Sequence, residues 1–335
     1  MGANVIVLDG AQARSDAPPF LEKRPLLRYF HMPGASVSER ISSIVDLLDT
    51  DYVVMACDDE LYIPKVVEKC IQELDENPDY ISAIGTAIGV GSVEKSFTWV
   101  DVYPKLRSQE KQPDSPPQRA IRHLSDYSPK YYYSVTRAGI WKKIWGQISS
   151  QEKSEVYAIK ELELEFAMSF AGKILSVPEV MWLRNGLVPS RGKANRLRIW
   201  DWLENEVHQS EVKNFLKSME SVVSSLPGSR EVGDSNQVEA FILQVFQLYA
   251  SKHKRKYSRT KSIYIGLKAS LLSVFPRRFR LEVRTLLFAN RRAKFLHECI
   301  GDGIGYDSME IRRMGRVLLQ ISNAKSILET SRLES

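Results

Sequence analysis

The stretch Asp51-Tyr52-Val53-Val54-Met55-Ala56-Cys57-Asp58-Asp59-Glu60-Leu61 decides the fold that we expect for this chain. Its first part, from Tyr52 to Cys57, is a run typical of a strand that is buried on both faces. Three adjacent carboxylates follow, and Pro64 then begins a helical pattern. Because an open α/β sheet binds its ligands at the carboxyl ends of parallel strands, the sequence predicts an acidic tip at the mouth of a crevice.

The carboxylates of Asp58, Asp59 and Glu60 repel one another unless a cation or hydrogen-bond donors offset their charge. Oxygen ligands of this kind suit Mg²⁺ or Mn²⁺, which usually hold the phosphates of a substrate. The alternative is a solvated acidic turn before the next helix. The apolar strand in front of the carboxylates favours a metal and nucleotide site.

Strand and helix patterns alternate around this stretch. A strand from Val5 to Leu8 comes first, and the capping box Ser36-Val37-Ser38-Glu39 begins a helix that leads to Tyr52. A helix from Pro64 to Glu76 and a strand from Ile81 to Val90 follow. This order predicts a mostly parallel α/β sheet flanked by helices.

Two aromatic segments follow the predicted sheet strands. Residues 91–117 predict a long loop or short hairpin over the ligand edge, with a disordered insertion as the alternative. Residues 127–135 carry four tyrosines, whose rings suit sugars but are equally ordinary strand material.

A second acidic cluster, Glu161-Leu162-Glu163-Leu164-Glu165, opens a helix that runs to Ala171. A carboxylate at a helix start is stabilised by the helix dipole, which explains at least one of these glutamates. The functional hypothesis is a general base that takes a proton from an acceptor hydroxyl. A strand from Lys173 to Leu183 follows Gly172.

Composition limits the compartment and the partners. The 335 residues are 43% hydrophobic and carry a net charge of +6. The spacing of the three cysteines predicts neither a disulfide framework nor a metal knuckle, which favours the reducing cytoplasm. No apolar run approaches the roughly 18 residues that a membrane-spanning helix needs.

The order of these parts resembles the family-2-like glycosyltransferases of the GT-A fold, and more closely their bacterial cell-surface polysaccharide subgroup. The similarity covers about residues 4 to 190. It rests on these segments: Val5 to Gly10, the helix from Val37, Asp51 to Glu60, Tyr127-Ser128-Pro129 with Tyr132 to Arg137, and Glu161 to Val177. Relative to the family, the first βα unit is missing, so we expect an N-terminally shortened chain.

The resemblance implies roles in binding a nucleoside-diphosphate sugar. Asp58 would contact the ribose or the metal, and Glu60 stands where a DxD-type motif has its metal-binding Asp. Asp59 belongs to the same cluster, and Asp9 would lie near the nucleotide base. Arg40 is either a phosphate ligand or a solvated helix residue.

The resemblance also implies a single displacement with inversion at the anomeric carbon. Glu161 falls where the family has its catalytic base, and Glu163 is its competitor, because a small shift in the match exchanges them. Mg²⁺ or Mn²⁺ on Asp58 and Glu60 would stabilise the departing nucleoside diphosphate.

The chain is expected to divide into a catalytic domain, residues 1–190, and a mainly helical region, residues 191–335. Residues 252–294 are basic and carry apolar clusters, which predicts peripheral contact with an anionic membrane, beside a lipid-linked acceptor. With the family resemblance, the expected acceptor is a glycan or lipid-linked molecule. A solvated basic face is the alternative. No motif supports binding to nucleic acid.

Two other functions stay open. A nucleotidyltransferase uses a similar sheet and acidic site, but nothing before Asp9 supplies its Gly-rich phosphate loop. A non-catalytic relative would bind glycans or partners as a scaffold.

Overall fold

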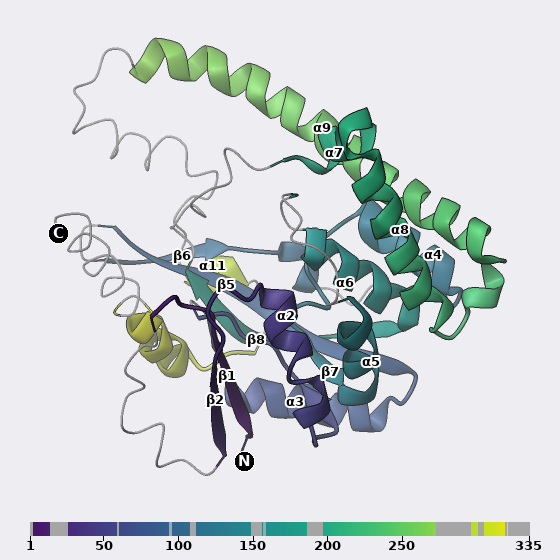
Figure 1. Ribbon diagram of the computed structural model, residues 1–335. Helices are drawn as coiled ribbons and strands as arrows, with labels where there is room; N and C mark the ends of the chain where they lie inside the picture. The colour runs from purple at the N-terminus through teal and green to yellow at the C-terminus, as the bar shows by residue number, and fades with distance from the viewer. Residues whose placement is uncertain are drawn as a thin grey trace.

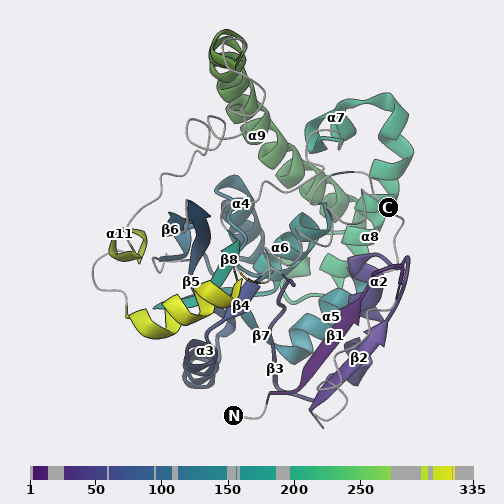
Figure 2. The same ribbon diagram turned by 90° about the vertical axis from the view of Figure 1, so that its left-hand side faces the viewer.

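The computed structural model describes residues 3–13, 26–58, 60–93, 96–107, 112–148, 156, 159–185, 197–272, 296–300, 305–318 and 320. Its strands form two sheets (Figure 1). Strands β1 (Val5–Asp9) and β2 (Leu27–His31) pair in parallel as a separate two-stranded sheet. Figure 2 shows this small sheet on the opposite side of the molecule from the short helix α11 (Leu296–Ile300).

The main sheet has six strands in the order β3-β7-β5-β8-β4, with β6 paired to β5. These strands are β3 (Tyr52–Val53), β4 (Glu60–Tyr62), β5 (Tyr80–Val93), β6 (Ser96–Asp101), β7 (Val135–Arg137) and β8 (Lys173–Asn185). Only β5 and β8 run parallel, and the other pairings are antiparallel.

The expectation of a mostly parallel sheet is therefore wrong, and the sheet is mixed. A parallel pair needs a long crossover, which the helices between β5 and β8 supply. Strands β5 and β6 instead form a hairpin, which confirms the hairpin alternative for this part of residues 91–117. Among the described residues, strand β1 pairs with β2 in the small sheet and not with the main sheet.

The predicted buried strand from Tyr52 to Cys57 is also shorter than expected. Only Tyr52 and Val53 are extended, as β3 at one edge of the main sheet, and their side chains are half-buried. Residues 54–57 are irregular. An edge strand has a partner on one side only, so this apolar run is not the centre of the sheet.

The centre is the pair β5 and β8, which are largely buried. A Cβ on Gly85 would lie 2.5 Å from the Cβ of Met181, so only glycine allows β5 and β8 to approach this closely. The register shifts between Ile84 and Thr86, opposite the part of β8 that contains Pro178. Proline fits such an irregularity because it lacks a ladder donor.

The helices follow the sequence pattern closely. The Ser36 capping box begins α2 (Val37–Ser42), and Pro64 is in the first turn of α3 (Pro64–Glu76), as predicted. Between β6 and β8 the chain forms α4 (Pro116–Ser125), α5 (Ala138–Ile148) and α6 (Ile159–Ala171). Helix α6 is buried over almost its full length because α4, α5 and α8 (Gln209–Ser224) surround it.

The described part after residue 190 is mainly helical, as expected. It contains α7 (Ile199–Glu204), α8, the long α9 (Ser235–Leu272) and α11, and residues 308–318 are also helical. Phe246 of α9 and Phe215 of α8 join Phe166 of α6 in one hydrophobic core. The division after residue 190 stays a prediction.

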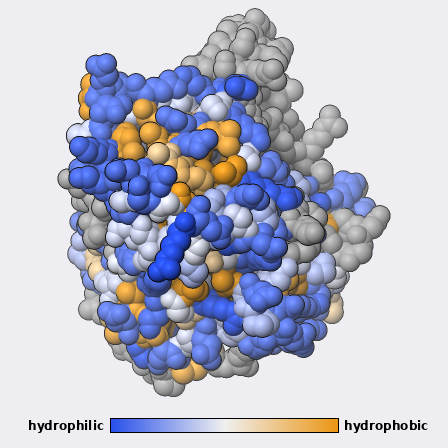
Figure 3. Space-filling view, turned by 90° about the vertical axis from the view of Figure 1, so that its right-hand side faces the viewer, coloured by the Kyte–Doolittle hydropathy of each residue, from blue (hydrophilic) through white to orange (hydrophobic). Residues whose placement is uncertain are grey.

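A second, smaller core covers part of the main sheet. Trp99 of β6 packs there with Cys299 of α11 and Ile311. On the other side of the molecule, α8 buries Phe215 and Met219, and Figure 3 shows the face on that side as mostly hydrophilic with small hydrophobic areas. Among the described residues, no helix is both long and apolar enough to cross a membrane.

Candidate functional site

The first predicted acidic cluster lies beside β4. Asp58 is exposed in a turn, whereas Asp59 lies outside the described residues. Glu60 begins β4 directly opposite Arg184 of β8, and its side chain is only 1% exposed. The guanidinium Nε of Arg184 is 3.9 Å from Glu60 Oε1. A buried carboxylate needs a nearby cation or donors, and Arg184 supplies positive charge here.

A group of stacked aromatic rings lies beside this ion pair. The ring of buried Trp182 stacks on Tyr133, with centroids 4.3 Å apart, and also on Tyr62 and Tyr103. The guanidinium of Arg184 lies 5.4 Å from the ring centroid of Tyr103 and also donates a hydrogen bond to its hydroxyl. These contacts hold the cation of Arg184 over aromatic faces.

Glu161 lies in the first turn of α6 and is half-buried. The hydroxyl of Tyr127 donates a hydrogen bond to Glu161 Oε1. Burial raises the pKa of Tyr127 well above its usual range, and the negative charge of Glu161 adds to this effect. The phenol therefore stays protonated and remains a donor to this carboxylate.

Glu163 has a different environment. Its side chain is 7% exposed, and Lys160 Nζ lies 2.9 Å from Glu163 Oε2. Burial raises the pKa of Glu163 to about 7, although Lys160 opposes the shift. Because successive helix residues are about 100° apart, Glu161 and Glu163 point in widely different directions.

Glu165 is fully buried on the same helix face as Glu161, one turn later. Its carboxylate accepts hydrogen bonds from the amides of Lys130, Tyr131 and Tyr132, and it lies 2.6 Å from Nε2 of His123.

Tyr132 and Tyr133 lie between the two acidic clusters. Burial raises the pKa of Tyr133 well above its usual range, and the charges of Glu60 and Glu161 both raise it further. The pKa of Tyr132 is raised by burial and by the same two carboxylates. The hydroxyl of Tyr62, two residues after Glu60, donates a 3.3 Å hydrogen bond to the carbonyl oxygen of Tyr133, and the amide of Tyr132 donates one to Glu165 of α6. The segment that carries these tyrosines therefore connects β4 with α6, although the two acidic clusters are far apart in the sequence.

Asp9 and Arg40 form a second group beside the two-stranded sheet. Asp9 Oδ2 accepts a 2.5 Å hydrogen bond from the hydroxyl of Tyr29. Arg40 Nη1 donates a 2.7 Å bond to the carbonyl oxygen of Leu8, and its guanidinium packs against Gly10. Arg40 therefore connects α2 to the end of β1, which differs from the solvated alternative that the sequence left open.

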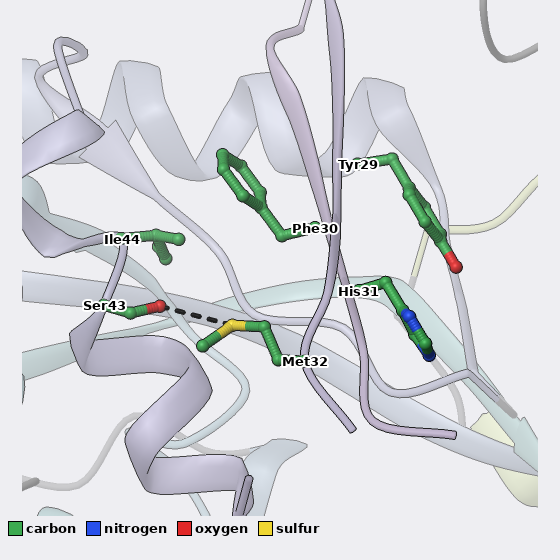
Figure 4. A pocket seen from close by; sticks show the side chains of 6 residues that line it. All are labelled: Tyr29, Phe30, His31, Met32, Ser43 and Ile44. Carbon is green, nitrogen blue, oxygen red and sulfur yellow. Dashed lines mark hydrogen bonds between the residues drawn. The ribbon is translucent and has the colours of Figure 1, made fainter. Parts of the chain in front are cut away.

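A hollow of about 570 Å³ lies next to this group (Figure 4). The side chains of Phe30 and Met32 lie on the side of β2 that faces Ser43 and Ile44, whereas those of Tyr29 and His31 lie on the other side (Figure 4). Ser43 Oγ donates a 3.4 Å hydrogen bond to Met32 Sδ. The hollow is thus lined by both polar and apolar side chains, from the carboxyl end of β2 and from the two residues that follow α2.

The predicted metal ligands do not form a complete coordination shell within the described part of the chain. Among the residues that the structure describes, no group of three or more His, Cys, Asp or Glu side chains can hold a metal ion. Mg²⁺ and Mn²⁺ sites often use one or two carboxylates together with substrate phosphates. Asp58 is exposed and fits this use, whereas Glu60 faces Arg184 and would have to turn away from it.

Four residues of the site were not predicted from the sequence: Glu165, His123, Tyr127 and Arg184. Glu165 belongs to the acidic cluster that drew attention to α6, and its spacing of four from Glu161 was a usable signal. Arg184 ends a predicted strand, where functional residues often lie. The role of His123 depends on a packing contact that no local pattern reveals.

The fold and site define a mixed α/β protein with two acidic clusters and a helical region after residue 190. No family model matches the chain, and no curated protein matches it.

The structure is similar to a crystal structure of S. aureus TarS 1-349, with 10% identity and a TM-score of 0.41 over 76% of this chain and 82% of that chain. It is also similar to S. aureus TarS 1-349 in complex with UDP-GlcNAc, with 12% identity and a TM-score of 0.47 over 80% of this chain and 67% of that chain.

Proposed function

We propose that this chain is a glycosyltransferase that moves a sugar from a nucleoside-diphosphate sugar to a hydroxyl group of a glycan or lipid-linked acceptor in surface polysaccharide biosynthesis. The observation that supports it best is that residues 127–133 connect the two acidic clusters. Tyr127 donates a hydrogen bond to Glu161, and the carbonyl oxygen of Tyr133 accepts one from Tyr62, two residues after Glu60. One cluster would face the donor diphosphate, and the other would face the acceptor hydroxyl. The family resemblance of residues 4 to 190 supports the same assignment.

Glu161 is the proposed general base. It is half-buried, so an acceptor can reach it, and Tyr127 orients one of its oxygens. Glu163 is almost fully buried against Lys160, and Glu165 is occupied by three amides and His123. Neither is placed as well as Glu161 to receive a proton from a substrate.

The proposed reaction is a single displacement. Glu161 takes the proton of the acceptor hydroxyl group. At the same time, the oxygen of that hydroxyl group forms a bond to the anomeric carbon. The bond between that carbon and the diphosphate oxygen breaks on the opposite face, so configuration inverts and the nucleoside diphosphate leaves with the bonding electrons.

Asp58 and Glu60 are the proposed metal-binding residues, with Asp59 beside them in the sequence. A bound Mg²⁺ or Mn²⁺ would stabilise the charge on the leaving diphosphate. Asp9 at the end of β1 and Arg40 of α2 are proposed to contact the nucleotide. Arg40 Nη1 already donates to the carbonyl oxygen of Leu8, so a phosphate contact would use another guanidinium nitrogen or replace this bond.

We also propose that the protein acts in the cytoplasm, with peripheral contact to the inner face of the membrane. The support is the basic composition of residues 252–294, most of which lie outside the described side chains. Anionic surfaces attract such segments by about 1 kcal/mol for each Lys or Arg close to the membrane.

Calorimetric titration with UDP, GDP, dTDP and CDP, with and without Mn²⁺, tests the donor site. Metal-dependent binding of one nucleotide supports the proposal and identifies the donor class. If none of the four nucleotides binds, the result contradicts the proposal and favours a non-catalytic scaffold protein. Release of pyrophosphate rather than a nucleoside diphosphate would favour a nucleotidyltransferase.

A further inference from the structure

Glu165 is a buried charged residue that the proposed reaction does not use. Its side chain is fully buried, and its carboxylate accepts hydrogen bonds from three consecutive main-chain amides. The shortest of these, from the amide of Tyr132 to Oε1, is 2.7 Å. Consecutive amides that converge on an anion form a strong binding nest, so Glu165 fixes the backbone of residues 130–132.

His123 completes the surroundings of Glu165. Its Nε2 lies 2.6 Å from Glu165 Oε2, and its ring contacts Tyr131 and Tyr127 edge-on, with centroids 5.3 Å and 6.0 Å away. Glu165 thus holds the His123 ring, and the His123 ring packs against Tyr127. Tyr249 of α9 packs edge-on against the same Tyr127 ring, at 5.5 Å.

The segment that Glu165 holds follows Tyr127, the residue that binds Glu161. Tyr127 lies three residues before the first bound amide, and its hydroxyl donates to Glu161. Tyr132 is the last bound residue. Tyr127, which binds Glu161, is therefore connected to Glu165 through the ring of His123 and through the main chain that leads to Lys130.

We propose that Glu165 is a positioning residue for Glu161, acting through His123 and Tyr127. It sets the orientation of the Glu161 carboxylate toward the acceptor and does not touch substrate. This inference rests on the proposed function, because it takes Glu161 as the general base. A purely structural role would change the stability of the fold and leave catalysis by the folded fraction unchanged.

A double-mutant cycle tests the inference. Wild type, Glu165→Gln, Tyr127→Phe and the double variant are compared for nucleoside diphosphate release from the donor. The added NH₂ of glutamine faces amide donors, so residues 130–132 lose part of their anchor. We expect Glu165→Gln to lower kcat about tenfold with KM for the donor unchanged within about twofold.

Coupling between the two positions gives the decisive readout. If Glu165 acts through Tyr127, the double variant is about as slow as the slower single variant. Independent effects that multiply would overturn the inference. Glu76→Gln, an exposed change of the same chemistry on α3, is the matched control and leaves kcat unchanged.

Variants at His123 keep the test open if Glu165→Gln does not fold. The side-chain amide of His123→Gln can still donate to Glu165, whereas His123→Phe keeps a ring and removes the donor. Because the proposed link needs both the bond to Glu165 and the ring against Tyr127, we expect each variant to lower kcat about as much as Glu165→Gln. Wild-type kcat in either His123 variant would contradict the inference.

The two proposals fail differently. A folded wild type that consumes no donor removes the proposed function, and the positioning role is lost with it. An active wild type whose variants show multiplying effects removes only the positioning role.

Discussion

The two acidic clusters consist of the same kind of residue, but the backbone gives them different environments. Around Asp58 and Glu60 the chain is irregular and then enters a short strand, so one carboxylate is exposed and the other turns inward to Arg184. Around Glu161 the chain is a buried helix, which sends alternate residues to different sides.

This difference shows that the sequence spacing of two carboxylates predicts their relative direction only when both lie in the same helix or strand. On α6, a spacing of four brings Glu161 and Glu165 to one face, where they share the segment that contains Tyr127 and Tyr132. A spacing of two separates Glu163 from both. In the irregular stretch, the same spacing of two separates exposed Asp58 from buried Glu60, because the pairing of β4 with β8 begins at Glu60.

The largest expected effect concerns the base. Glu161→Gln should lower the rate of sugar transfer about a thousandfold, because it removes the proton acceptor. Its affinity for the donor should stay within about threefold of wild type by calorimetry. Glu163→Gln is the comparison on the same helix, and intact turnover in Glu161→Gln would move the base role to Glu163.

The second prediction concerns the pH dependence of protein stability that the buried carboxyl group of Glu163 causes. The carboxyl ionises near 4.5 in the unfolded chain and at about 7 in the fold, so the folded protein binds more protons between these values. Stability should therefore fall as pH rises from about 4.5 to 7, by roughly 3 kcal/mol at most.

Glu163→Gln removes this dependence, because glutamine does not ionise. Urea unfolding at pH 5 and pH 8 measures the effect, and the variant should gain stability over wild type at pH 8. Identical pH slopes in the two proteins would contradict the assigned environment.

The third prediction distinguishes the two carboxylates of the first cluster. Both Asp58→Ala and Glu60→Ala should abolish metal-dependent donor binding in calorimetry. Asp58→Ala should change the free energy of unfolding by less than about 0.5 kcal/mol, because Asp58 is exposed. Glu60→Ala should also destabilise the fold, since it empties a buried site beside Arg184. Unchanged donor binding in Asp58→Ala would remove it from the metal site.

The smallest expected effect concerns Arg184. Arg184→Ala takes the cation away from buried Glu60 and should cost about 1 kcal/mol of unfolding free energy, a small value because the pair is 3.9 Å long and Arg184 is partly exposed. Adding Glu60→Gln should restore part of the loss. Lys254→Ala breaks an exposed ion pair with Glu204 and should have no measurable effect.

The sequence by itself determined most helices and their ends. The Ser36 capping box, Pro64 at a first turn and Gly172 after α6 are local signals, because each satisfies or ends the hydrogen bonds of its own helix. The strands β5 and β8 were also predictable from their continuous apolar runs. These features depend on residues a few positions apart.

Only the tertiary structure decided the strand directions and the neighbours of each carboxylate. Tyr52 to Cys57 reads as a central strand, but its place at the sheet edge depends on β7, more than 80 residues later. Glu165 has its partners in residues 123–132, on another element. Pairing and burial of this kind depend on long-range packing, which no local pattern in the chain encodes.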